Sequence, residues 1–410
     1  MKPLAEAQAD VLRACPPLPV ERTPLESALG LVLAEDVTAP HPVPPFANSA
    51  MDGYAVVARD TAHPPVRLAV LEDVPAGSVA STEVRPGSAI KIMTGAPLPA
   101  GADSVVKVED TETDSTEVVV KVAVRAGEAV RPAGSDVQMG ETILRTGTRL
   151  FPPHLAVLAT IGVGDPLVAR RSRVAVMSTG DELVPIEEPL TPGMIHDSNR
   201  PLLLSMLKEL GADVLDFGII PDDPDHLRDT LAKAASEADV ILTSGGVSMG
   251  EHDVVKKLLL DLGDIEFWRV AMQPAKPFAF GRLDGTPFFG LPGNPVSVMV
   301  AFEQFARPAI LSMMGARNVF RPRISGTLIQ PVFTDPEKTV FLRVACAFRS
   351  GRWEASLSGG QGSHVLSALA AANGFAVVPV GVGEVAAGAV VEVEMFTWPE
   401  TRTREEVLGG

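Results

Sequence analysis

The stretch Asp239-Val-Ile-Leu-Thr-Ser-Gly-Gly-Val-Ser-Met-Gly-Glu-His-Asp253 decides the fold of this chain. Its apolar, β-branched beginning predicts a buried strand over residues 240–243, and residues 254–262 predict a helix. The glycine and hydroxyl loop then lies at the carboxyl end of a strand, where open α/β sheets bind ligands. Adjacent glycines let backbone N–H groups turn toward an anion, so the loop predicts a phosphate site. The alternative is a plain strand-to-helix turn, because glycine pairs are common in turns.

Strands and helices continue to alternate around this segment. Strands are predicted over 173–178 and 214–220, with helices over about 198–210 and after Pro221-Asp-Asp-Pro224. Such alternation predicts a parallel sheet with helices on both faces. The unit closes with Phe288-Phe-Gly-Leu-Pro-Gly-Asn-Pro295 and a long apolar helix, for which Asn294 is the expected N-cap and Pro295 the first-turn proline.

The remaining segments do not show this alternation of strands and helices. Residues 1–40 predict helices, one of them opening at the capping-box pattern Thr23-Pro-Leu-Glu26, whereas the prolines of residues 39–46 exclude a helix. Short alternating runs over about 50–150 predict a β-rich domain, and strands from about 319 predict a small β barrel or sandwich. The expected fold class is multidomain α/β plus β, with a helical linker domain (1–40 together with 140–170), a β-rich domain (41–139), a central α/β domain with a parallel sheet (171–318) and a C-terminal β barrel-like domain (319–410).

Length and composition restrict the function. The 410 residues exceed the roughly 250–300 that one core serves, so two or more domains are expected. With 35 Lys and Arg against 51 Asp and Glu, the net charge of −16 disfavours nucleic-acid and anionic membrane surfaces. Two cysteines, Cys15 and Cys346, are too few for a disulfide framework or a cysteine zinc site. Without a visible signal peptide or an apolar run of roughly 20 residues, we expect a cytoplasmic protein that binds a small molecule.

Acidic residues follow three of the predicted strands. Glu182 lies in Ser178-Thr-Gly-Asp-Glu182, Asp222 follows Pro221, and Asp253 ends the glycine loop. Carboxylates at one edge of a sheet, beside a phosphate site, suit Mg²⁺, which takes oxygen ligands and bridges to phosphate. For Asp222 and Asp223 the alternative is capping of the following helix.

Cationic residues could bind an oxyanion. Arg269 follows an apolar run, and Lys276 lies between two prolines that stiffen its backbone. Arg343 is embedded in an apolar strand, and Gly362-Ser-His-Val365 opens a helix-like run whose free N–H groups suit an anion. Each of these residues could instead have only a structural role.

One motif points to a different reaction. Gly246-Val-Ser-Met-Gly250 matches the nucleophile elbow of α/β hydrolases, with His364 as a conceivable base. The elbow requires its serine directly after the strand, and here the extra glycines displace Ser248. A serine hydrolase is therefore a minor alternative.

Six segments of the chain, in this order, carry a family resemblance: Pro45-Phe-Ala-Asn-Ser-Ala-Met-Asp-Gly-Tyr-Ala55, Ile92-Met-Thr-Gly-Ala-Pro97, Ser178-Thr-Gly-Asp-Glu182, Ser244-Gly-Gly-Val-Ser248, Leu291-Pro-Gly-Asn-Pro295 and Gly362-Ser-His364. The chain resembles, nearly end to end, the molybdopterin molybdenumtransferases of molybdenum-cofactor biosynthesis and the related E domain of gephyrin. The resemblance implies an elongated homodimer with a molybdopterin-binding α/β domain. It also implies a reaction in which adenylylated molybdopterin and molybdate give molybdenum cofactor and AMP, with Mg²⁺ or a similar divalent cation. The implied protein partners are the adenylyltransferase that precedes it in the pathway and the molybdoenzyme apoproteins.

Matching the motifs residue by residue assigns roles within this sequence. The implied catalytic residues are Asp52, Thr94, Glu182, Asp222 and Asp253, of which the last three are the metal ligands. Asp52 and Thr94 are expected to face the α/β domain of the second chain. The implied substrate-binding residues are Thr179, Gly180, Asp181, Ser244, Gly245, Gly246, Ser248, Arg269, Lys276, Pro292, Gly293, Asn294, Pro295, Arg343 and Ser363. The chain departs from the commonest family pattern at Gln273 and Ala275. A pterin-binding scaffold without turnover is the alternative from another class.

Overall fold

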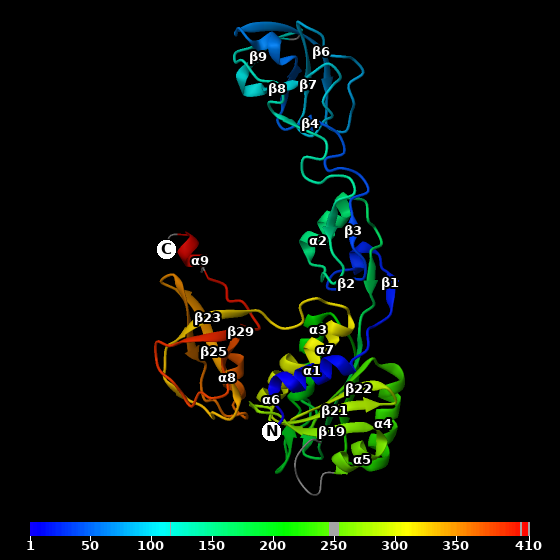
Figure 1. Ribbon diagram of the computed structural model, residues 1–410, viewed down its shortest axis with the longest axis vertical. Coiled ribbons are helices and arrows are strands. Elements are labelled where there is room, and N and C mark those ends of the chain that lie inside the picture. The colour runs from blue at the N-terminus through cyan, green and yellow to red at the C-terminus, as the bar shows by residue number, and fades with distance from the viewer. Residues whose placement is uncertain (115, 246–253, 402–403, 409–410) are drawn as a thin grey trace.

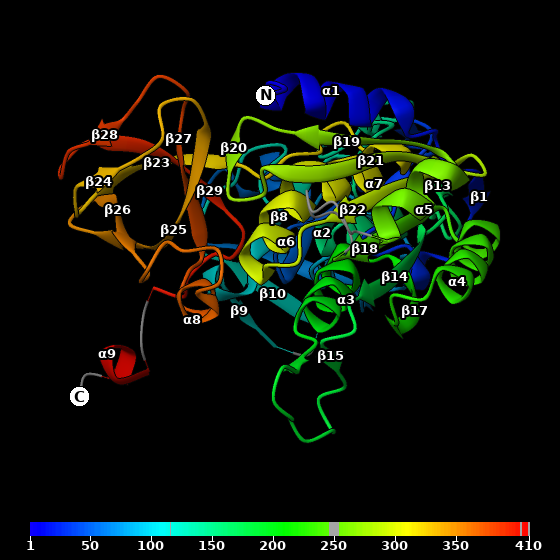
Figure 2. The same ribbon diagram turned by 90° about the horizontal axis from the view of Figure 1, so that it is seen from below.

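The computed structural model describes residues 1–114, 116–245, 254–401 and 404–408. Figure 1 shows an elongated molecule with a β-rich unit at one end and a narrow middle section that carries α2 (Pro152–Thr160). The α/β unit and the C-terminal sheet lie side by side at the other end (Figures 1 and 2). This arrangement separates the β-rich unit from the α/β unit of the same chain.

A six-stranded sheet forms the centre of the α/β unit. β17, β14, β18 and β22 run parallel in that order, which confirms the predicted parallel arrangement. β21 continues the sheet antiparallel to β22, and β19 pairs antiparallel with β21. The bounds are β14 (Arg173–Thr179), β17 (Asp213–Ile220), β18 (Val240–Ser244), β19 (Asp264–Arg269), β21 (Pro277–Leu283) and β22 (Thr286–Leu291).

The β21–β22 hairpin is a feature that our sequence analysis missed. Its turn consists of Asp284 and Gly285, with φ of 46° and 84°. Two successive residues with positive φ match the twist of antiparallel strands, and Asp-Gly is a favoured pair for this turn. The hairpin turns the chain back, so that the beginning of β21 lies beside the end of β22.

Helices cover both faces of this sheet. Alternate residues of a strand point to opposite faces, and Val174 and Val176 belong to one buried cluster while Ala175 and Met177 belong to another. The first face packs against α3 (Asn199–Leu210), α6 (Pro295–Ala301), the π-helical turn η4 (Phe302–Ala306) and α7 (Arg307–Met313). The second packs against α4 (Pro224–Glu237) and α5 (Val254–Leu262). Both faces are apolar, so the strand ends are left for polar chemistry.

The C-terminal sheet closes into a barrel, one of the two predicted forms. Five strands pair in the order β25, β26, β23, β29 and β27, and β27 also pairs with β25. β20 (Met272–Gln273), from the α/β unit, pairs with β25 and joins the two units. The other bounds are β23 (Arg323–Leu328), β24 (Val332–Phe333), β25 (Thr339–Arg349), β26 (Arg352–Leu357), β27 (Gly374–Val378), β28 (Glu384–Val385), β29 (Val390–Met395), α8 (Leu366–Ala370) and α9 (Arg404–Leu408).

The β-rich unit contains a six-stranded sheet and a two-stranded one. The large sheet has the order β8 (Ser104–Lys107), β5 (Gly53–Val56), β7 (Ser88–Ile92), β6 (Val66–Val74), β10 (Glu117–Val120) and β9 (Thr111–Thr113). The small one pairs β4 (Asn48–Ser49) with β11 (Val130–Arg131). Two apolar clusters fill its interior.

The middle section contradicts part of the helix prediction for residues 1–40. α1 (Leu4–Ala14) is a helix, but Thr23-Pro-Leu-Glu26 leads only to the short 3₁₀ turn η1 (Leu25–Ser27), without a side-chain cap. The physical reason is strand pairing on either side of this turn, which holds the flanking residues extended and outweighs the local cap. The strands are β1 (Val20–Arg22), β2 (Val32–Leu33) and β13 (Leu167–Ala169), with β3 (Val37–Thr38) paired to β12 (Thr142–Leu144).

None of the helices within the described residues is long and apolar enough to cross a lipid bilayer.

Candidate active site

The carboxyl ends of the four parallel strands meet at one edge. Thr179 at the end of β14 is in register with Ile220 of β17, and Ser178 with Ser244 of β18. Ser244 is in turn in register with Leu291 of β22. The loops that begin at Gly180, Pro221, Gly245 and Pro292 therefore lie next to one another.

A cavity of about 250 Å³ opens at this edge. It is lined by seven of the residues assigned from the sequence, together with residues of the segment that precedes α3 and one residue of the C-terminal unit. The lining is Thr179, Glu182, Leu183, Ile195, His196, Asp197, Ser198, Asn199, Ser244, Gly245, Gly293, Asn294, Pro295 and His364. The small pair β15 (Leu183–Val184) and β16 (Ile195–His196) forms one wall.

Asp197 and Asn199 are site residues that the sequence analysis did not single out. The side-chain Nδ2 of Asn199 donates to Ser244 Oγ at 2.7 Å and to the Gly293 carbonyl at 2.6 Å. Asp197 is 2 % exposed and accepts hydrogen bonds from Ser178 Oγ and from the Nε of Arg200. These two residues therefore connect β14, β18 and the loop before α6. The polar run His196-Asp-Ser-Asn199 at the start of a helix was the available signal.

The loop carboxylates divide into two kinds. Asp223 is the N-cap of α4 and accepts the His226 N–H at 2.8 Å, so the capping alternative holds for Asp223. Asp222 is not the cap residue, and its backbone N–H donates to Asp181 Oδ1 at 3.0 Å. This bond joins the loops after β14 and β17, which carry Glu182 and Asp222. Asp253 lies outside the described residues, as do Gly246 and Ser248.

Two glycines make close contacts at the starts of these loops. Gly180 has φ of +146°, and a Cβ there would lie 2.6 Å from Glu182 Oε2. Gly245 has φ of +93°, and a Cβ there would lie 2.4 Å from the Thr179 carbonyl oxygen. A Cβ at Gly245 would meet backbone, so a larger residue there would move the loop. A Cβ at Gly180 would meet only the carboxylate end of the Glu182 side chain, which would have to shift away.

The donor atoms at this edge suit a hard cation. Thr179 and Asn199 line the cavity, and their Oγ1 and Oδ1 atoms are buried and have no hydrogen-bond partner among the described residues. Buried polar atoms are nearly always paired, so these two oxygens indicate a polar ligand. With the carboxylate of Glu182, which lines the same cavity, they are oxygen donors of the kind that Mg²⁺ prefers, and Asp222 follows the neighbouring strand. Within the described ranges, no three His, Cys, Asp or Glu side chains cluster as a complete metal site.

The predicted cationic residues of the α/β unit reach the same edge. Arg269, at the end of β19, is in register with Pro277, at the beginning of β21. The backbone carbonyl of Lys276 accepts the Val270 N–H at 2.9 Å, and its side chain is exposed. β20, in the same loop, pairs with the barrel strand β25, so the loop of Lys276 is held between the two units.

Ala275 has a backbone conformation that is unusual for its residue type. It is 3 % exposed and has φ of 68°, in the left-handed region that favours glycine. Its Cβ costs roughly 1–2 kcal/mol there, whereas glycine loses roughly 0.5–1 kcal/mol in chain entropy. We therefore expect Ala275→Gly to leave the midpoint of thermal unfolding unchanged or raise it. As a control, Ala232→Gly in the exposed interior of α4 should lower it, because glycine costs about 1 kcal/mol in a helix. Equal losses in the two variants would contradict this expectation.

Arg343 is fully buried in the barrel, and no carboxylate of the described residues pairs with it. Its Nη2 donates to the carbonyls of Gly360 and Gly362 at 2.6 and 3.1 Å, while Nε and Nη1 have no partner among the described residues. Burial lowers the pKa of this guanidinium from its ordinary value. Ser363, in the loop that Arg343 holds, accepts a hydrogen bond from the Asn294 amide at 3.1 Å. Asn294 occupies the predicted N-cap position of α6, but its side chain bonds Ser363 instead of capping the helix.

Asp52 and Thr94 form a pair of their own in the β-rich unit. Asp52 Oδ1 accepts both the hydroxyl and the backbone N–H of Thr94 at 2.7 Å, and these bonds lower the pKa of Asp52. Figure 1 shows this unit at the opposite end of the molecule from the α/β sheet. One chain does not bring Asp52 and Thr94 to the edge that carries Glu182 and Asp222.

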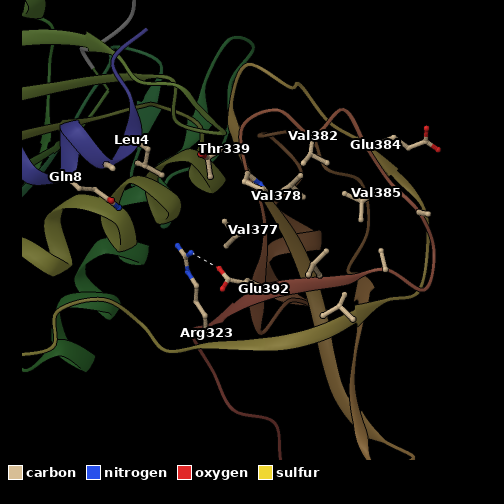
Figure 3. Close-up of a pocket in the computed structure, with 16 residues that line it drawn as sticks. Leu4, Gln8, Arg323, Thr339, Val377, Val378, Val382, Glu384, Val385 and Glu392 are labelled. Atoms are coloured by element: carbon tan, nitrogen blue, oxygen red, sulfur yellow. Dashed lines mark hydrogen bonds and ion pairs between the residues drawn. The ribbon is translucent and has the colours of Figure 1, made fainter.

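A larger cavity, of about 690 Å³, lies elsewhere, between α1 and the C-terminal barrel (Figure 3). Its wall consists mainly of valines and alanines, with the ion pair between Arg323 and Glu392 on one side. Of the residues assigned to the reaction, none that the structure describes lines it. The polar donors needed for chemistry are at the sheet edge, not in this groove.

Comparison with known proteins gives the family. Three family models match in order: the MoeA N-terminal region (domain I and II) over residues 2–162, a probable molybdopterin binding domain over 175–312, and the MoeA C-terminal region (domain IV) over 326–396. The chain is 41 % identical over 395 residues to molybdopterin molybdenumtransferase 2 of Mycobacterium tuberculosis, covering 94 % of this chain and 96 % of that protein. It is 36 % identical over 400 residues to the Haemophilus influenzae molybdopterin molybdenumtransferase, covering 97 % and 99 %. The crystal structure of the molybdopterin biosynthesis moeA protein from Pyrococcus horikoshii superimposes with a TM-score of 0.83 at 30 % identity, covering 97 % of this chain and 100 % of that one. The chain therefore belongs to the molybdopterin molybdenumtransferase (MoeA) family.

Proposed function

We propose that this protein is the transferase that inserts molybdenum from molybdate into adenylylated molybdopterin, forming molybdenum cofactor and releasing AMP. The observation that carries the proposal is the juxtaposition of an oxygen-lined cavity at the sheet edge with the Ser363 loop held by the partly unpaired Arg343. The cavity suits a phosphate with its bound cation, and the Ser363 loop with Arg343 suits an oxyanion. The names of the family's curated members agree with this reaction.

The residues of the sheet edge would act on the adenylate. Glu182 and Asp222, with Asp253, would hold Mg²⁺, which neutralises phosphate charge when bound. The loops of Ser244 and Gly245 and of Gly293 and Asn294 would position the pterin and its phosphate. Asn199 would keep these two loops together through its bonds to Ser244 and Gly293.

Molybdate, a substrate dianion, would bind on the side of the barrel. Arg343 offers two buried donors, Ser363 a hydroxyl and Lys276 an exposed ammonium from the loop tied to β25. A buried guanidinium without a carboxylate partner favours an anion, because its charge is otherwise uncompensated.

We further propose that the site is completed in a cytoplasmic homodimer. Asp52 and Thr94 would face the α/β unit of a second chain, and their distance from the acidic edge of their own chain supports this. The adenylyltransferase and the apoproteins that receive the cofactor remain the proposed protein partners. The predicted division into four units stays a prediction. Cores of their own in the β-rich unit and the barrel support it for these two units, whereas one apolar cluster joins the middle section to the α/β unit.

AMP release tests this function directly. Purified protein with adenylylated molybdopterin should release AMP only when both molybdate and Mg²⁺ are present. A protein that binds the pterin substrate and releases no AMP under any combination of metal and molybdate would instead be a scaffold. Labelling of Ser248 by a fluorophosphonate would favour the hydrolase alternative.

The oxyanion assignment gives a further prediction. Arg343→Lys keeps the charge and removes the planar fork, so we expect the molybdate concentration for half-maximal rate to rise about tenfold, the loss of one charge-assisted hydrogen bond. Arg352→Lys, at an exposed position of the neighbouring strand β26, is the matched control and should leave the curve unchanged. Unchanged molybdate saturation in Arg343→Lys and Lys276→Ala alike would place the anion elsewhere.

A further inference from the structure

A second polar cavity, separate from the candidate active site, lies in the middle of the molecule. Its volume is about 540 Å³, and it lies between the segment that leads into α2 on one side and α7 with the loop that follows it on the other. Figure 1 shows α2 in the middle section and α7 in the α/β unit below it. It is lined by Gly147, Thr148, Arg149, Phe151, His154, Arg307, Leu311, Ala316, Arg317 and Asn318. Three of these residues are arginines, and no residue of the lining is an Asp or a Glu. This is notable because the chain as a whole has a net charge of −16.

Two of the arginines are held in place without being fully neutralised. Arg149 donates Nε to the Gly30 carbonyl at 3.1 Å and Nη2 to the Leu210 carbonyl at 2.8 Å, and carbonyls carry no net charge. Arg307 is 9 % exposed, and its nearest carboxylate is Glu303 at 3.7 Å. Glu303 already accepts two hydrogen bonds from Arg321, each at 3.0 Å. Burial, with the nearby Arg321 and Arg149, lowers the pKa of Arg307 to about 10.

The third arginine is held by its backbone and is available to a ligand. Within the described ranges, the guanidinium of Arg317 makes no hydrogen bond or ion pair. Its backbone N–H donates to the Gly147 carbonyl at 3.1 Å, and its stem packs on Gly147, where a Cβ would lie 2.3 Å from Arg317 Cγ. The missing side chain of Gly147 therefore makes room for Arg317.

The opposite wall adds neutral donors. His154 Nδ1 accepts the Phe151 N–H at 3.0 Å, so in the neutral ring the proton is on Nε2, which is a donor. Phe151 is the N-cap residue of α2 and has no side-chain oxygen with which to compensate the positive end of the helix dipole. The cavity therefore combines three cations and a donor imidazole, beside a helix start whose first two residues, Pro152 and Pro153, have no N–H to donate.

We propose that this cavity binds a phosphate-bearing small molecule. Three arginines in a lining without Asp or Glu, with Glu303 shared between Arg307 and Arg321, favour an anion of more than one charge. Arginine pairs with phosphate through two parallel hydrogen bonds. The volume lies within the range of about 300–1,000 Å³ of small-molecule pockets, so it accommodates more than the phosphate alone. Such a ligand would bridge the middle section and the α/β unit, because Arg149 belongs to the first and Arg307 to the second.

Calorimetric titration of the full-length protein with inorganic pyrophosphate, in the presence of EDTA, tests this proposal. EDTA removes metal-dependent binding at the acidic edge. We expect one pyrophosphate per chain to bind at this cavity, and Arg317→Met to weaken that binding about tenfold. Gly147→Ala, which displaces Arg317 while keeping its charge, should also weaken it. Arg59→Met, an equal change of charge on the distant β-rich unit, should leave it unchanged, as should Arg343→Lys.

Three results would overturn the proposal. The first is the absence of any pyrophosphate binding in EDTA. The second is equal affinity in the Arg317→Met variant and the unmodified protein. The third is loss of pyrophosphate binding in Arg343→Lys but not in Arg317→Met. In that case the heat of binding would come from pyrophosphate bound at Arg343 in the barrel.

Discussion

Asp222→Ala is expected to slow AMP release by at least about a hundredfold, because removal of a metal ligand withdraws charge stabilisation from the transition state. The protein should remain folded, since Asp222 is an exposed loop residue that does not cap α4. AMP release from adenylylated molybdopterin, measured across a Mg²⁺ titration, checks this. Raising Mg²⁺ should recover part of the rate if the lost group is a ligand.

The adjacent residue is a matched control for this variant. Asp223→Ala removes the N-cap of α4, which should cost about 1 kcal/mol of stability and leave AMP release close to normal. Comparison of the two variants thus distinguishes an effect on catalysis from an effect on helix capping. Normal turnover in Asp222→Ala, or a larger loss of turnover in Asp223→Ala, would rule out the metal-ligand role of Asp222.

Mixing two inactive variants is expected to restore activity. Asp52→Ala and Asp222→Ala should each be inactive as homodimers, but a heterodimer has one composite site with both carboxylates intact. A two-fold interface makes the sharing of residues reciprocal, so equal amounts after free subunit exchange should recover about a quarter of normal AMP release. The measurement requires two different affinity tags, which show that heterodimers have formed.

A second pair distinguishes this arrangement from general rescue by mixing. Asp52 and Thr94 belong to the same unit of the same chain, so in an Asp52→Ala with Thr94→Ala heterodimer both composite sites are damaged. That pair should stay inactive. If heterodimers form and the Asp52 and Asp222 variants remain inactive together, each site is built within one chain.

Several parts of the fold could be predicted because their signals are local. The strand that ends at Ser244, the helix α5 and the proline at the start of α6 follow from side chains within a few residues of each other. The same holds for the adjacent positions of the loops after β14 and β17, since parallel strands end at a common edge. The capping-box prediction at Thr23 failed because the pairing of β1, β2 and β13, which is not local, outweighs a cap.

Side-chain partners could not be predicted in the same way. Both the Asp222 and the Asp223 carboxylate matched a helix cap in the sequence, and only the backbone path of the loop selects Asp223. Asn199 belongs to the site because α3 begins beside the ends of β18 and β22. In the sequence, Arg343 matched both an oxyanion site and a structural role. Only the structure shows that it bonds two backbone carbonyls and keeps two donors without a partner among the described residues.

The sequence by itself determined the order of the units, the mainly parallel sheet at the centre and the strand ends at which the acidic and glycine-rich loops lie. These depend on periodicity and on turn residues, which act over one element or one turn. Only the tertiary structure decided that Asn294 contacts Ser363, that Asp52 and Thr94 lie far from the acidic edge, and that Arg149, Arg307 and Arg317 line one cavity. The reason is that packing between units brings together residues that are far apart in the sequence, such as Arg149 and Arg317, which are 168 positions apart. No local pattern specifies which charges this packing leaves without a counterion.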